Sequence, residues 1–358
     1  MGNKSGALSI GIIGCGGVTE TFHLPALKSL RGVTVRALSD PDEDKLERLS
    51  ESYDIKNRYD DPYELINRPE IEAVAVCAPV ECHFALGTAA LNAGKHLFIE
   101  KPVVLRMEEC EKLITIAENS GVKTQVGFNL RWHRNVRKAK EVIEEGKLGP
   151  VKLVRSVIST NHPVIPEWRK NRERGGGAIF DLAIHHFDLL RYLFGAEAEV
   201  IYTESISGDI QDEAAVVSLR MTNGVLSSSV FSFRSAHCNE VEIFGDSGSL
   251  KLSLYDINGL EIRPSAIPPG GLISRIKKPF RMIMQTADNA AALKHAGIFK
   301  ESYYMEWQSF RDSVIQDKET ECNLEDGRHA LGITLSAVES VLSGMPVKIS
   351  GAPDKQVK

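Results

Sequence analysis

Three features that would mark other classes of protein are missing from this sequence of 358 residues. It has no run of about 18 apolar residues, so we expect no membrane-spanning helix. Its formal net charge of −5 lacks the basic footprint of a nucleic-acid-binding protein. Residues 1–9 contain one lysine and no apolar core of signal-peptide length, so we expect a cytoplasmic location.

Cysteine is scarce, with six residues and no Cys-x-x-Cys pair. Cys77 and Cys82 are close in sequence, but the chain has no second pair of cysteines that could complete a zinc site with them. The spacing therefore predicts no zinc site. Scattered thiols of this kind are typical of a reducing compartment. We therefore expect no bound metal and a cytoplasmic protein.

The composition that is present, with 42% apolar and 25% charged residues, is typical of a globular chain long enough for two domains. Residues 1–125 alternate short apolar runs with amphipathic segments, which predicts a parallel α/β domain of the Rossmann type. The expected strands are Leu8–Ile13, Val33–Leu38, Ala73–Ala78, His96–Ile99 and Lys123–Gly127. The expected helices are Thr19–Leu30, Asp42–Tyr53, Pro62–Ile66, His83–Asn92 and Met107–Ser120.

Residues 126–350 follow a different pattern, which predicts a second, α+β domain with an open sheet. The expected helices are Asn135–Gly146, Ala178–Phe194, Tyr303–Gln316 and Glu325–Ser343, the last of which can pack back on the first domain. The expected strands are Ala215–Met221, Val225–Phe233, Glu240–Phe244 and Ser249–Leu254, joined by tight turns and so antiparallel. Residues 263–300 form a long irregular insertion, of a kind that often serves as a lid or a subunit contact.

The clearest motif is Gly14-Cys15-Gly16, between the first expected strand and the first expected helix. Glycine lets the backbone at such a turn approach a pyrophosphate, and the N-terminus of the following helix attracts the phosphate charge. Thr19 stands at the third glycine position of the motif, where its bulk predicts slightly looser packing of helix on strand. We therefore predict a dinucleotide at this turn.

Asp40 ends the second expected strand, where a carboxylate accepts hydrogen bonds from ribose hydroxyls and repels a 2′-phosphate. No arginine or lysine occupies the next four positions, which favours NAD over NADP. Asp40 could also be the N-cap of the helix expected from Asp42, and the two roles are compatible.

Six segments together resemble the glucose–fructose oxidoreductase/inositol dehydrogenase (Gfo/Idh/MocA) family over nearly the whole chain. They are GIIGCGGVTETFHLPAL, IEAVAVCAPVECH, AGKHLFIEKP, VGFNLRWHRNVRKAKEVIEEGKLGPV, WRKNRERGGGAIFDLAIHHFDLLRYLFG and NLEDGRHALGITLSAVESVLSGMPV. The resemblance implies a C-terminal domain whose large, mostly antiparallel sheet forms a homodimer or homotetramer through its open face. It also implies a cis peptide before Pro102, which turns the Lys101 ammonium toward the nicotinamide. Val80 and Ala183 depart from the family pattern without removing a group that transfers a proton.

The motifs and the resemblance together give an expected cofactor site. Its residues are Gly14, Gly16, Gly17, Val18, Asp40, Ala78, Pro79, His83, Glu100, Lys101, Pro102 and Asn129. His23 and His83 stand near expected helix starts, where we expect them to position other groups and not to act as catalysts.

Three residues are the expected catalytic groups: Lys101, Asp181 and His185. Oxidation of an alcohol needs a base for the hydroxyl proton, and histidine needs the least adjustment of its pKa for that role. Asp181 and His185 are four residues apart, which places them on one face of an ideal helix, whereas His186 points elsewhere. Lys101 supplies positive charge for a developing alkoxide. The glycine run before Asp181 is expected to leave room for a ligand.

Several further residues have two open interpretations. Arg131, Trp168 and Arg169 could bind substrate, with Trp168 as an aromatic wall of a sugar site. Alternatively, Arg131 lies on a solvated helix start and Trp168 has a packing role. Asp188 could contact His185 or play a structural part.

The favoured function is an NAD(P)-dependent oxidoreductase that interconverts a secondary alcohol and a ketone on a sugar, cyclitol or sugar derivative. One alternative is a glycosidase of the same family that uses NAD transiently, without net redox change. Another is a nucleotide-sensing regulatory protein without activity, which the joint presence of Lys101, Asp181 and His185 argues against.

Overall fold

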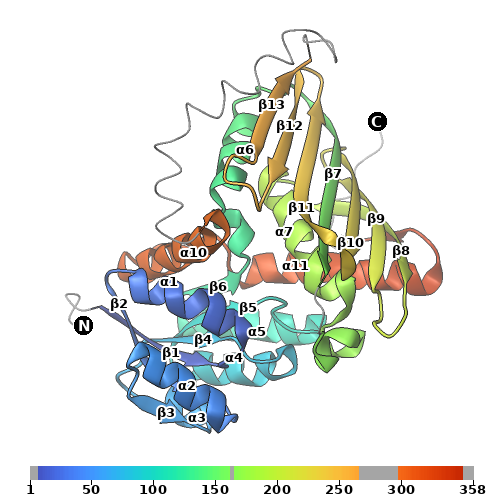
Figure 1. The fold of residues 1–358 in the computed structure, drawn as a ribbon. Helices are drawn as coiled ribbons and strands as arrows, with labels where there is room; N and C mark the ends of the chain where they lie inside the picture. Colours follow the sequence, from blue (N-terminus) through green and yellow to red (C-terminus); the bar gives the residue numbers. More distant parts are fainter. Residues whose placement is uncertain (1–6, 162–164, 266–296, 350–358) are drawn as a thin grey trace. The chain divides into compact units, whose positions relative to one another are not determined.

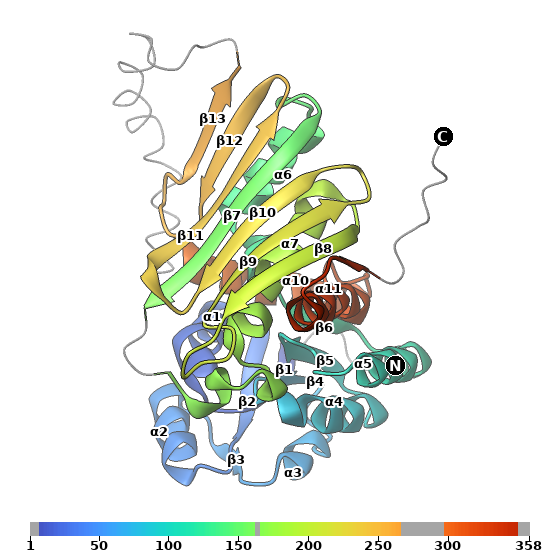
Figure 2. The ribbon, with the colours of Figure 1, turned by 90° about the vertical axis from the view of Figure 1, so that its right-hand side faces the viewer.

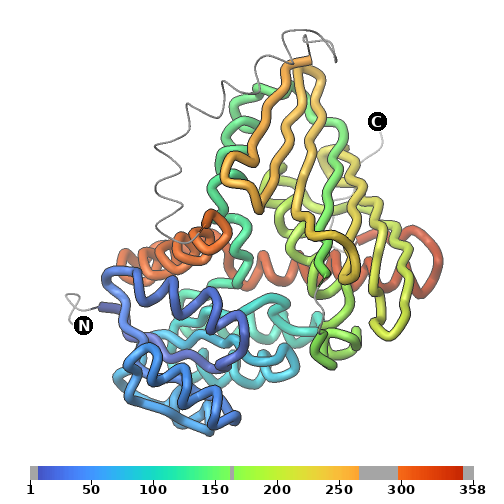
Figure 3. The backbone as a smooth tube through the Cα atoms, viewed as in Figure 1, coloured from blue at the N-terminus to red at the C-terminus, as the bar shows by residue number. Residues whose placement is uncertain are grey.

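The computed structural model describes residues 7–161, 165–265 and 297–349. The chain forms two compact units, and Figure 3 traces its path through them from blue to red. The first unit comprises Met1–Asn129 and Lys300–Leu331, and the second comprises Leu130–Phe299 and Gly332–Lys358. The boundaries expected from the sequence were 1–125 and 126–350, whereas here residues 300–331 group with the first unit. Most of the insertion expected at 263–300 lies outside the described residues.

The first unit contains a six-stranded parallel sheet in the order β3-β2-β1-β4-β5-β6 (Figure 1), which confirms the Rossmann prediction. The strand order reverses between β1 and β4, and ligands of open α/β sheets bind outside the carboxyl ends of strands at such a point. The strands are β1 (Leu8–Ile13), β2 (Val33–Ser39), β3 (Asn57–Tyr59), β4 (Ala73–Val76), β5 (His96–Glu100) and β6 (Thr124–Gly127). The short β3 was not predicted.

The helices of the first unit lie close to their predicted positions. They are α2 (Glu43–Tyr53), α3 (Pro62–Ile66), α4 (His83–Asn92) and α5 (Met107–Ser120). The helix expected over 19–30 is divided into a π-helical turn, Thr19–His23, and α1 (Leu24–Ser29). Every residue of β1 and of β4 is buried, because a parallel sheet is covered on both faces.

The second unit is built on an eight-stranded sheet in the order β13-β12-β11-β7-β10-β9-β8-β14 (Figure 2). Neighbouring strands are antiparallel except for β7 and β10, which confirms a large, mostly antiparallel sheet. The strands are β7 (Val151–Asn161), β8 (Ala198–Ile206), β9 (Ala214–Met221), β10 (Leu226–Ser232), β11 (Arg234–Gly245), β12 (Gly248–Ser253), β13 (Leu260–Pro264) and β14 (Val347–Lys348).

The prediction for this sheet omitted β8, β13, β14 and β7, and the omission of β7 made the expected strand order wrong. That strand lies between β10 and β11, so these two consecutive strands are not paired with each other. Polar side chains on its inner face obscure the apolar alternation that marks a strand. Ser156 is buried there and donates a hydrogen bond to Ser229 Oγ over 2.8 Å.

One face of this sheet packs on helices, seen behind the strands in Figure 2. Helices α6 (Arg134–Glu144) and α7 (Ile184–Phe194) contribute Val136 and Phe187 to the hydrophobic core. The opposite face of the sheet carries exposed apolar side chains, which are Leu153, Val216, Leu226, Val230 and Phe244.

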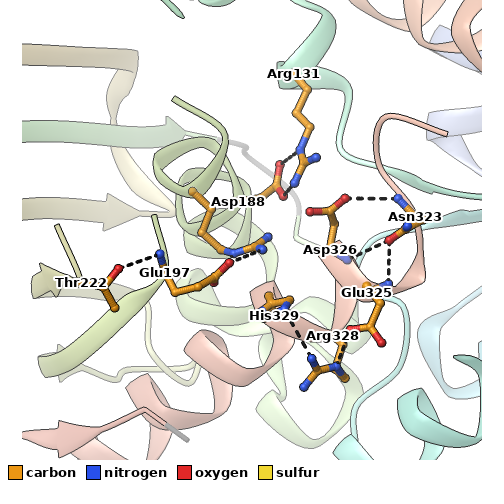
Figure 4. Close-up of polar contacts among 10 residues, drawn as sticks. Arg131, Asp188, Glu197, Thr222, Asn323, Glu325, Asp326, Arg328 and His329 are labelled. Atoms are coloured by element: carbon orange, nitrogen blue, oxygen red, sulfur yellow. Dashed lines mark hydrogen bonds and ion pairs between the residues drawn. The ribbon is translucent and has the colours of Figure 1, made fainter. Parts of the chain in front are cut away.

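Two further helices of the described residues are α10 (Ile298–Ile315) and α11 (Leu324–Ser343). Asn323 caps α11, because its Oδ1 accepts hydrogen bonds from the N–H groups of Glu325 and Asp326 (Figure 4). Within the described ranges, no helix has both the length and the apolar character needed to cross a membrane.

Candidate active site

The glycine turn after β1 has the shape that a pyrophosphate needs. Gly14 has φ +104°, and a Cβ there would lie 2.5 Å from the carbonyl oxygen of Cys77. Only glycine fits that position. A Cβ on Gly16 or Gly17 would have no protein atom within 4 Å, so the outer side of the turn is open. The turn therefore fits a dinucleotide phosphate approaching the backbone from that side.

Thr19 takes part in this turn, although the sequence suggested only that its bulk would loosen the packing. Its hydroxyl is buried and donates a hydrogen bond to the carbonyl oxygen of Gly14 over 2.7 Å. The bond joins the π-helical segment to the strand end, so the side chain closes the turn from behind.

Asp40 contacts the same turn from the end of β2. Its Oδ2 accepts a hydrogen bond from the N–H of Cys15 over 2.6 Å, and its Oδ1 accepts one from the N–H of Asp42 over 2.9 Å. Asp42, and not Asp40, is the N-cap of α2, because its side chain accepts from the N–H of Lys45. Each carboxylate oxygen of Asp40 has a further lone pair for a ribose hydroxyl.

His83 joins the end of β4 to the segment after β5. It begins α4 and is buried, with Nε2 2.8 Å from the carbonyl oxygen of Ala78. Its Nδ1 lies 3.0 Å from the carbonyl oxygen of Pro102. Burial lowers the pKa of this imidazole. Both ring nitrogens contact backbone, which is the geometry of a positioning group.

Glu100 lies at the end of β5 and holds the peptide that leads to Lys101. The peptide bond between Lys101 and Pro102 is cis, as the family resemblance implied. Glu100 Oε2 accepts a hydrogen bond from the N–H of Lys101 over 3.1 Å. A Cβ on Gly127 of β6 would lie 2.7 Å from Glu100 Oε1, so glycine at this position lets the carboxylate lie close to the backbone of β6.

His23 connects Glu100 to Trp307 of α10, a residue that the sequence analysis did not single out. The indole N–H of Trp307 donates to Nδ1 of His23 over 3.0 Å. Because Nδ1 is the acceptor, Nε2 carries the proton and donates to Glu100 Oε1 over 2.9 Å. His23 and Trp307 are fully buried. No sequence signal links positions 23 and 307, since the contact arises only in the fold.

Asn129, expected at the cofactor, follows β6 and is buried. Its amide Nδ2 donates a hydrogen bond to Ser302 Oγ of α10 over 2.9 Å. One of its two amide hydrogens is therefore used within the first unit.

In the second unit, the two neighbouring histidines of α7 have different environments. His186 is fully buried, and its Nε2 lies 3.1 Å from Oδ1 of Asn239. Burial lowers the pKa of His186 to about 4, so its ring is neutral at physiological pH. His185 is half-buried. Of the pair, His185 is the one with solvent access.

Asp181 lies in a π-helical turn, Ile179–Ala183, that precedes α7. The angular step of an ideal α-helix, on which the predicted shared face with His185 rested, does not hold through such a turn. Asp181 is buried, and its Oδ2 lies 3.1 Å from Nε of Arg169. The Arg169 guanidinium also lies 5.2 Å from the ring centre of Trp168. Of the two residues expected at the substrate, Arg169 therefore lies beside Asp181, and Trp168 lies beside Arg169.

The glycine run before Asp181 does not leave room for a ligand in the way that the sequence suggested. A Cβ on Gly176 would lie 2.4 Å from the carbonyl oxygen of Arg169, and one on Gly177 would lie 2.6 Å from that of Gln211. Gly175 has φ +78° and ends a 3₁₀ turn. These glycines let backbone segments of the protein itself pack closely, so that interpretation was wrong.

Arg131 is buried, which excludes the solvated helix start considered from the sequence. Its Nε and Nη2 donate to the two carboxylate oxygens of Asp188 over 2.8 and 2.5 Å (Figure 4). The guanidinium lies 5.5 Å from the ring centre of Tyr192. Asp188 is thus the partner of Arg131 on the inner side of α7. In the described part of the chain, no group of three His, Cys, Asp or Glu residues could hold a metal ion.

Both domains of the chain are similar to domains of known proteins. The sequence profile of an oxidoreductase family with an NAD-binding Rossmann fold, Gfo/Idh/MocA, matches residues 8–128, and the C-terminal domain of the same family matches residues 136–251. Myo-inositol 2-dehydrogenase of Thermotoga maritima is 33% identical over 68% of this chain and 74% of its own length. The scyllo-inositol 2-dehydrogenase (NAD(+)) of Bacillus subtilis is 26% identical over 94% of this chain and 95% of its own.

A solved structure is also similar. The crystal structure of a probable dehydrogenase from Thermotoga maritima superposes with a TM-score of 0.78 at 28% identity, covering 95% of this chain and 98% of that one. Two matched domains, the shared fold and the glycine turn that fits a dinucleotide lead to one conclusion. This chain belongs to the Gfo/Idh/MocA family of oxidoreductases, and its first domain is an NAD-binding Rossmann domain.

Proposed function

We propose that this chain is an NAD-dependent dehydrogenase that interconverts a secondary alcohol and a ketone on a cyclitol, sugar or sugar derivative, with His185 as the general acid/base. The observation that carries the proposal is the contrast between the two histidines of α7. His186 is buried, neutral and beside Asn239, whereas His185 keeps solvent access on α7, which directly follows the π-helical turn of Asp181. A proton-transfer group must be both titratable and accessible, and His185 meets both requirements.

NAD, when bound, supplies the hydride acceptor. His185 removes the hydroxyl proton of the substrate as the carbon–hydrogen bond breaks, and returns it in the reverse direction. Asp181, which pairs with Arg169, is proposed to orient the imidazole or a neighbouring substrate hydroxyl. The Lys101 ammonium stabilises the negative charge that develops on the substrate oxygen.

The Asp40 contacts support NAD as the cofactor over NADP. The Asp40 carboxylate stands against the glycine turn, where it would repel a 2′-phosphate. The first cations after it, Lys45 and Arg48, form ion pairs with Asp42 and Glu20. In this proposal, the cofactor contacts come from Gly14, Gly16, Gly17, Val18, Asp40, Ala78, Pro79, His83, Glu100, Lys101, Pro102 and Asn129.

Cyclitols are the favoured substrates, because both relatives named above are inositol dehydrogenases. Trp168 and Arg169 are the proposed substrate-contacting residues; Arg169 pairs with Asp181, and Trp168 contacts Arg169. Trp168 can cover the apolar face of a ring, and Arg169 can donate to ring hydroxyls from its outer edge. Arg131 is proposed to support the site through Asp188 of α7.

The open sheet face supports a homodimer or homotetramer. Leu226, Leu153 and Phe244 are neighbours across three strands and are all exposed in the single chain. An exposed apolar row of this kind is typical of a subunit interface. All six cysteines are free thiols, which supports a reducing, cytoplasmic compartment.

The test is a substrate panel of inositols, free sugars and nucleotide sugars, with NADH formation followed at 340 nm for NAD and for NADP in parallel. We expect turnover with a cyclitol and NAD. Sugar released from a glycoside without accumulated NADH would instead identify the NAD-dependent glycosidase. Binding of NAD without turnover of any compound in either direction would contradict the proposed dehydrogenase.

A further inference from the structure

Asp212 is a fully buried carboxylate in the loop between β8 and β9. Its Oδ2 accepts from Nε of Arg172 over 2.7 Å, and its Oδ1 accepts from Nη2 of Arg172 over 2.6 Å. Ser205 Oγ donates to the same Oδ1 over 2.7 Å. Bidentate pairing with arginine fixes direction as well as distance. The position of the Arg172 side chain is therefore set by Asp212.

The same loop contacts the backbone of the segment that runs from Lys170 to Ala178. The N–H of Gln211 donates to the carbonyl oxygen of Lys170 over 2.9 Å, and Gln211 Oε1 accepts from the N–H of Arg172 over 2.8 Å. The N–H of Ala178 donates to the carbonyl oxygen of Asp212 over 2.8 Å. Asp212 has φ 48°, a left-handed conformation that costs energy in a residue other than glycine. The loop thus has a strained backbone at Asp212, and it is hydrogen-bonded to both ends of the segment from Lys170 to Ala178.

This segment directly follows Arg169, whose Nε lies 3.1 Å from Asp181. The Arg169 side chain is about one-third exposed, while that of Asp181 is buried. Because the Arg169 side chain is partly exposed, its position depends on the backbone that carries it. Gly176 packs against the carbonyl of Arg169, so the segment attached to Asp212 fixes that backbone.

We propose that Asp212 is a positioning residue of the active site, which places Arg169 beside Asp181 through its pair with Arg172. This proposal rests on the proposed function of Asp181 and His185. Arg169 balances the charge of Asp181, four residues before His185. When Arg169 is not fixed, the Asp181 carboxylate loses this nearby positive charge. The more negative surroundings then favour the protonated imidazole, so the base form of His185 becomes rarer at neutral pH.

The main variant is Asp212→Asn, because asparagine tolerates the left-handed backbone as aspartate does and removes only the charge. We expect kcat/KM, with the cyclitol that the panel identifies, to fall by about 10- to 100-fold and the acid limb of the pH–rate profile to move to higher pH. Arg169→Gln should act in the same way. The double variant should be no worse than the more impaired single variant, whereas multiplied losses would overturn the proposal.

The matched control is Glu197→Gln, at the other end of α7. Glu197 accepts two hydrogen bonds from Arg191, over 2.7 and 2.8 Å, and takes no part in the proposed chemistry. It should leave kcat/KM and the pH profile unchanged; an equal loss would show a general effect of weakened ion pairs and overturn the proposal. If Asp212→Asn does not fold, Ser205→Ala removes one bond to Asp212 and should give a smaller loss of the same kind.

A second readout does not need turnover. The C2 proton of His185, followed by NMR as a function of pH, should titrate at higher pH in Asp212→Asn and in Arg169→Gln, by equal amounts. A moved midpoint in a protein that turns over no substrate would support the role of Asp212 and reject the proposed dehydrogenase. An unmoved midpoint in a protein that is active on a cyclitol would reject the role of Asp212 alone.

Discussion

The hydroxyl of Thr19 donates a hydrogen bond to the carbonyl oxygen of Gly14 over 2.7 Å. Both groups are buried behind the turn that is proposed to bind the cofactor phosphates. Thr19→Val keeps the shape of the side chain and leaves the carbonyl without this donor. We expect the free energy of unfolding to fall by about 1–2 kcal/mol and NAD to bind several-fold more weakly. Urea unfolding and a fluorescence titration with NAD measure the two effects.

Thr19→Ser is the control for that variant, because serine retains the hydroxyl. It should stay close to wild type in NAD affinity. Equal weakening by valine and by serine would show that the methyl group, and not the hydrogen bond, matters at this position.

Substitution by alanine is expected to have different effects on stability at Gly16 and at Gly176. Gly16→Ala adds a Cβ where no protein atom lies within 4 Å, so the free energy of unfolding should change by less than about 0.5 kcal/mol while NAD affinity falls at least tenfold. Gly176→Ala adds a Cβ 2.4 Å from the Arg169 carbonyl, so it should destabilise the fold by about 2 kcal/mol or more. Thermal unfolding and NAD titration of both proteins test the pair, and a destabilised Gly16→Ala protein would contradict an open turn.

Acid should destabilise the fold through two buried histidines. Burial lowers the pKa of His133 and of His186 to about 4, below the value of about 6.5 for histidine in an unfolded chain. The unfolded state therefore binds more protons as the pH falls from about 6.5 to about 4. The free energy of unfolding is therefore highest above pH 6.5. It decreases as the pH falls to about 4, by about 3 kcal/mol for each histidine.

The measurement is the free energy of urea unfolding at several pH values between 8 and 4. His186→Gln should flatten the decline, because glutamine does not titrate. His237→Gln, at an exposed position, should leave the decline unchanged. A curve for His186→Gln that runs parallel to wild type would contradict a neutral, buried His186.

Much of the first domain could be predicted from the sequence, because its strands are continuous apolar runs and its turns carry Gly14, Asp40 and Pro102 at recognisable positions. Strand β7 could not, because Ser156 stands where an apolar side chain was expected and pairs with Ser229 instead. Local pattern shows which face of a strand is apolar, but not whether a polar inward residue finds a partner on another strand.

The candidate site, like the fold, could be predicted from the sequence only in part. The residue types and spacing singled out Asp181 and His185, but the π-helical turn at Ile179–Ala183 leaves no mark in the sequence. Arg169 was expected only as a substrate contact, and the sequence did not indicate that it also pairs with Asp181. Asp212 lies in an unremarkable loop, and its proposed role depends on its partner Arg172, 40 residues away in the chain. Contacts between distant segments are set by packing, which no local pattern contains.

The central claim is that His185 is the general acid/base of an NAD-dependent dehydrogenase. The most direct measurement compares His185→Gln and His186→Gln for NAD binding by fluorescence and for turnover at 340 nm with the identified cyclitol. We expect both variants to bind NAD as the wild type does, and only His185→Gln to lose turnover, by at least about 100-fold. Turnover by His185→Gln at the wild-type rate would contradict the account.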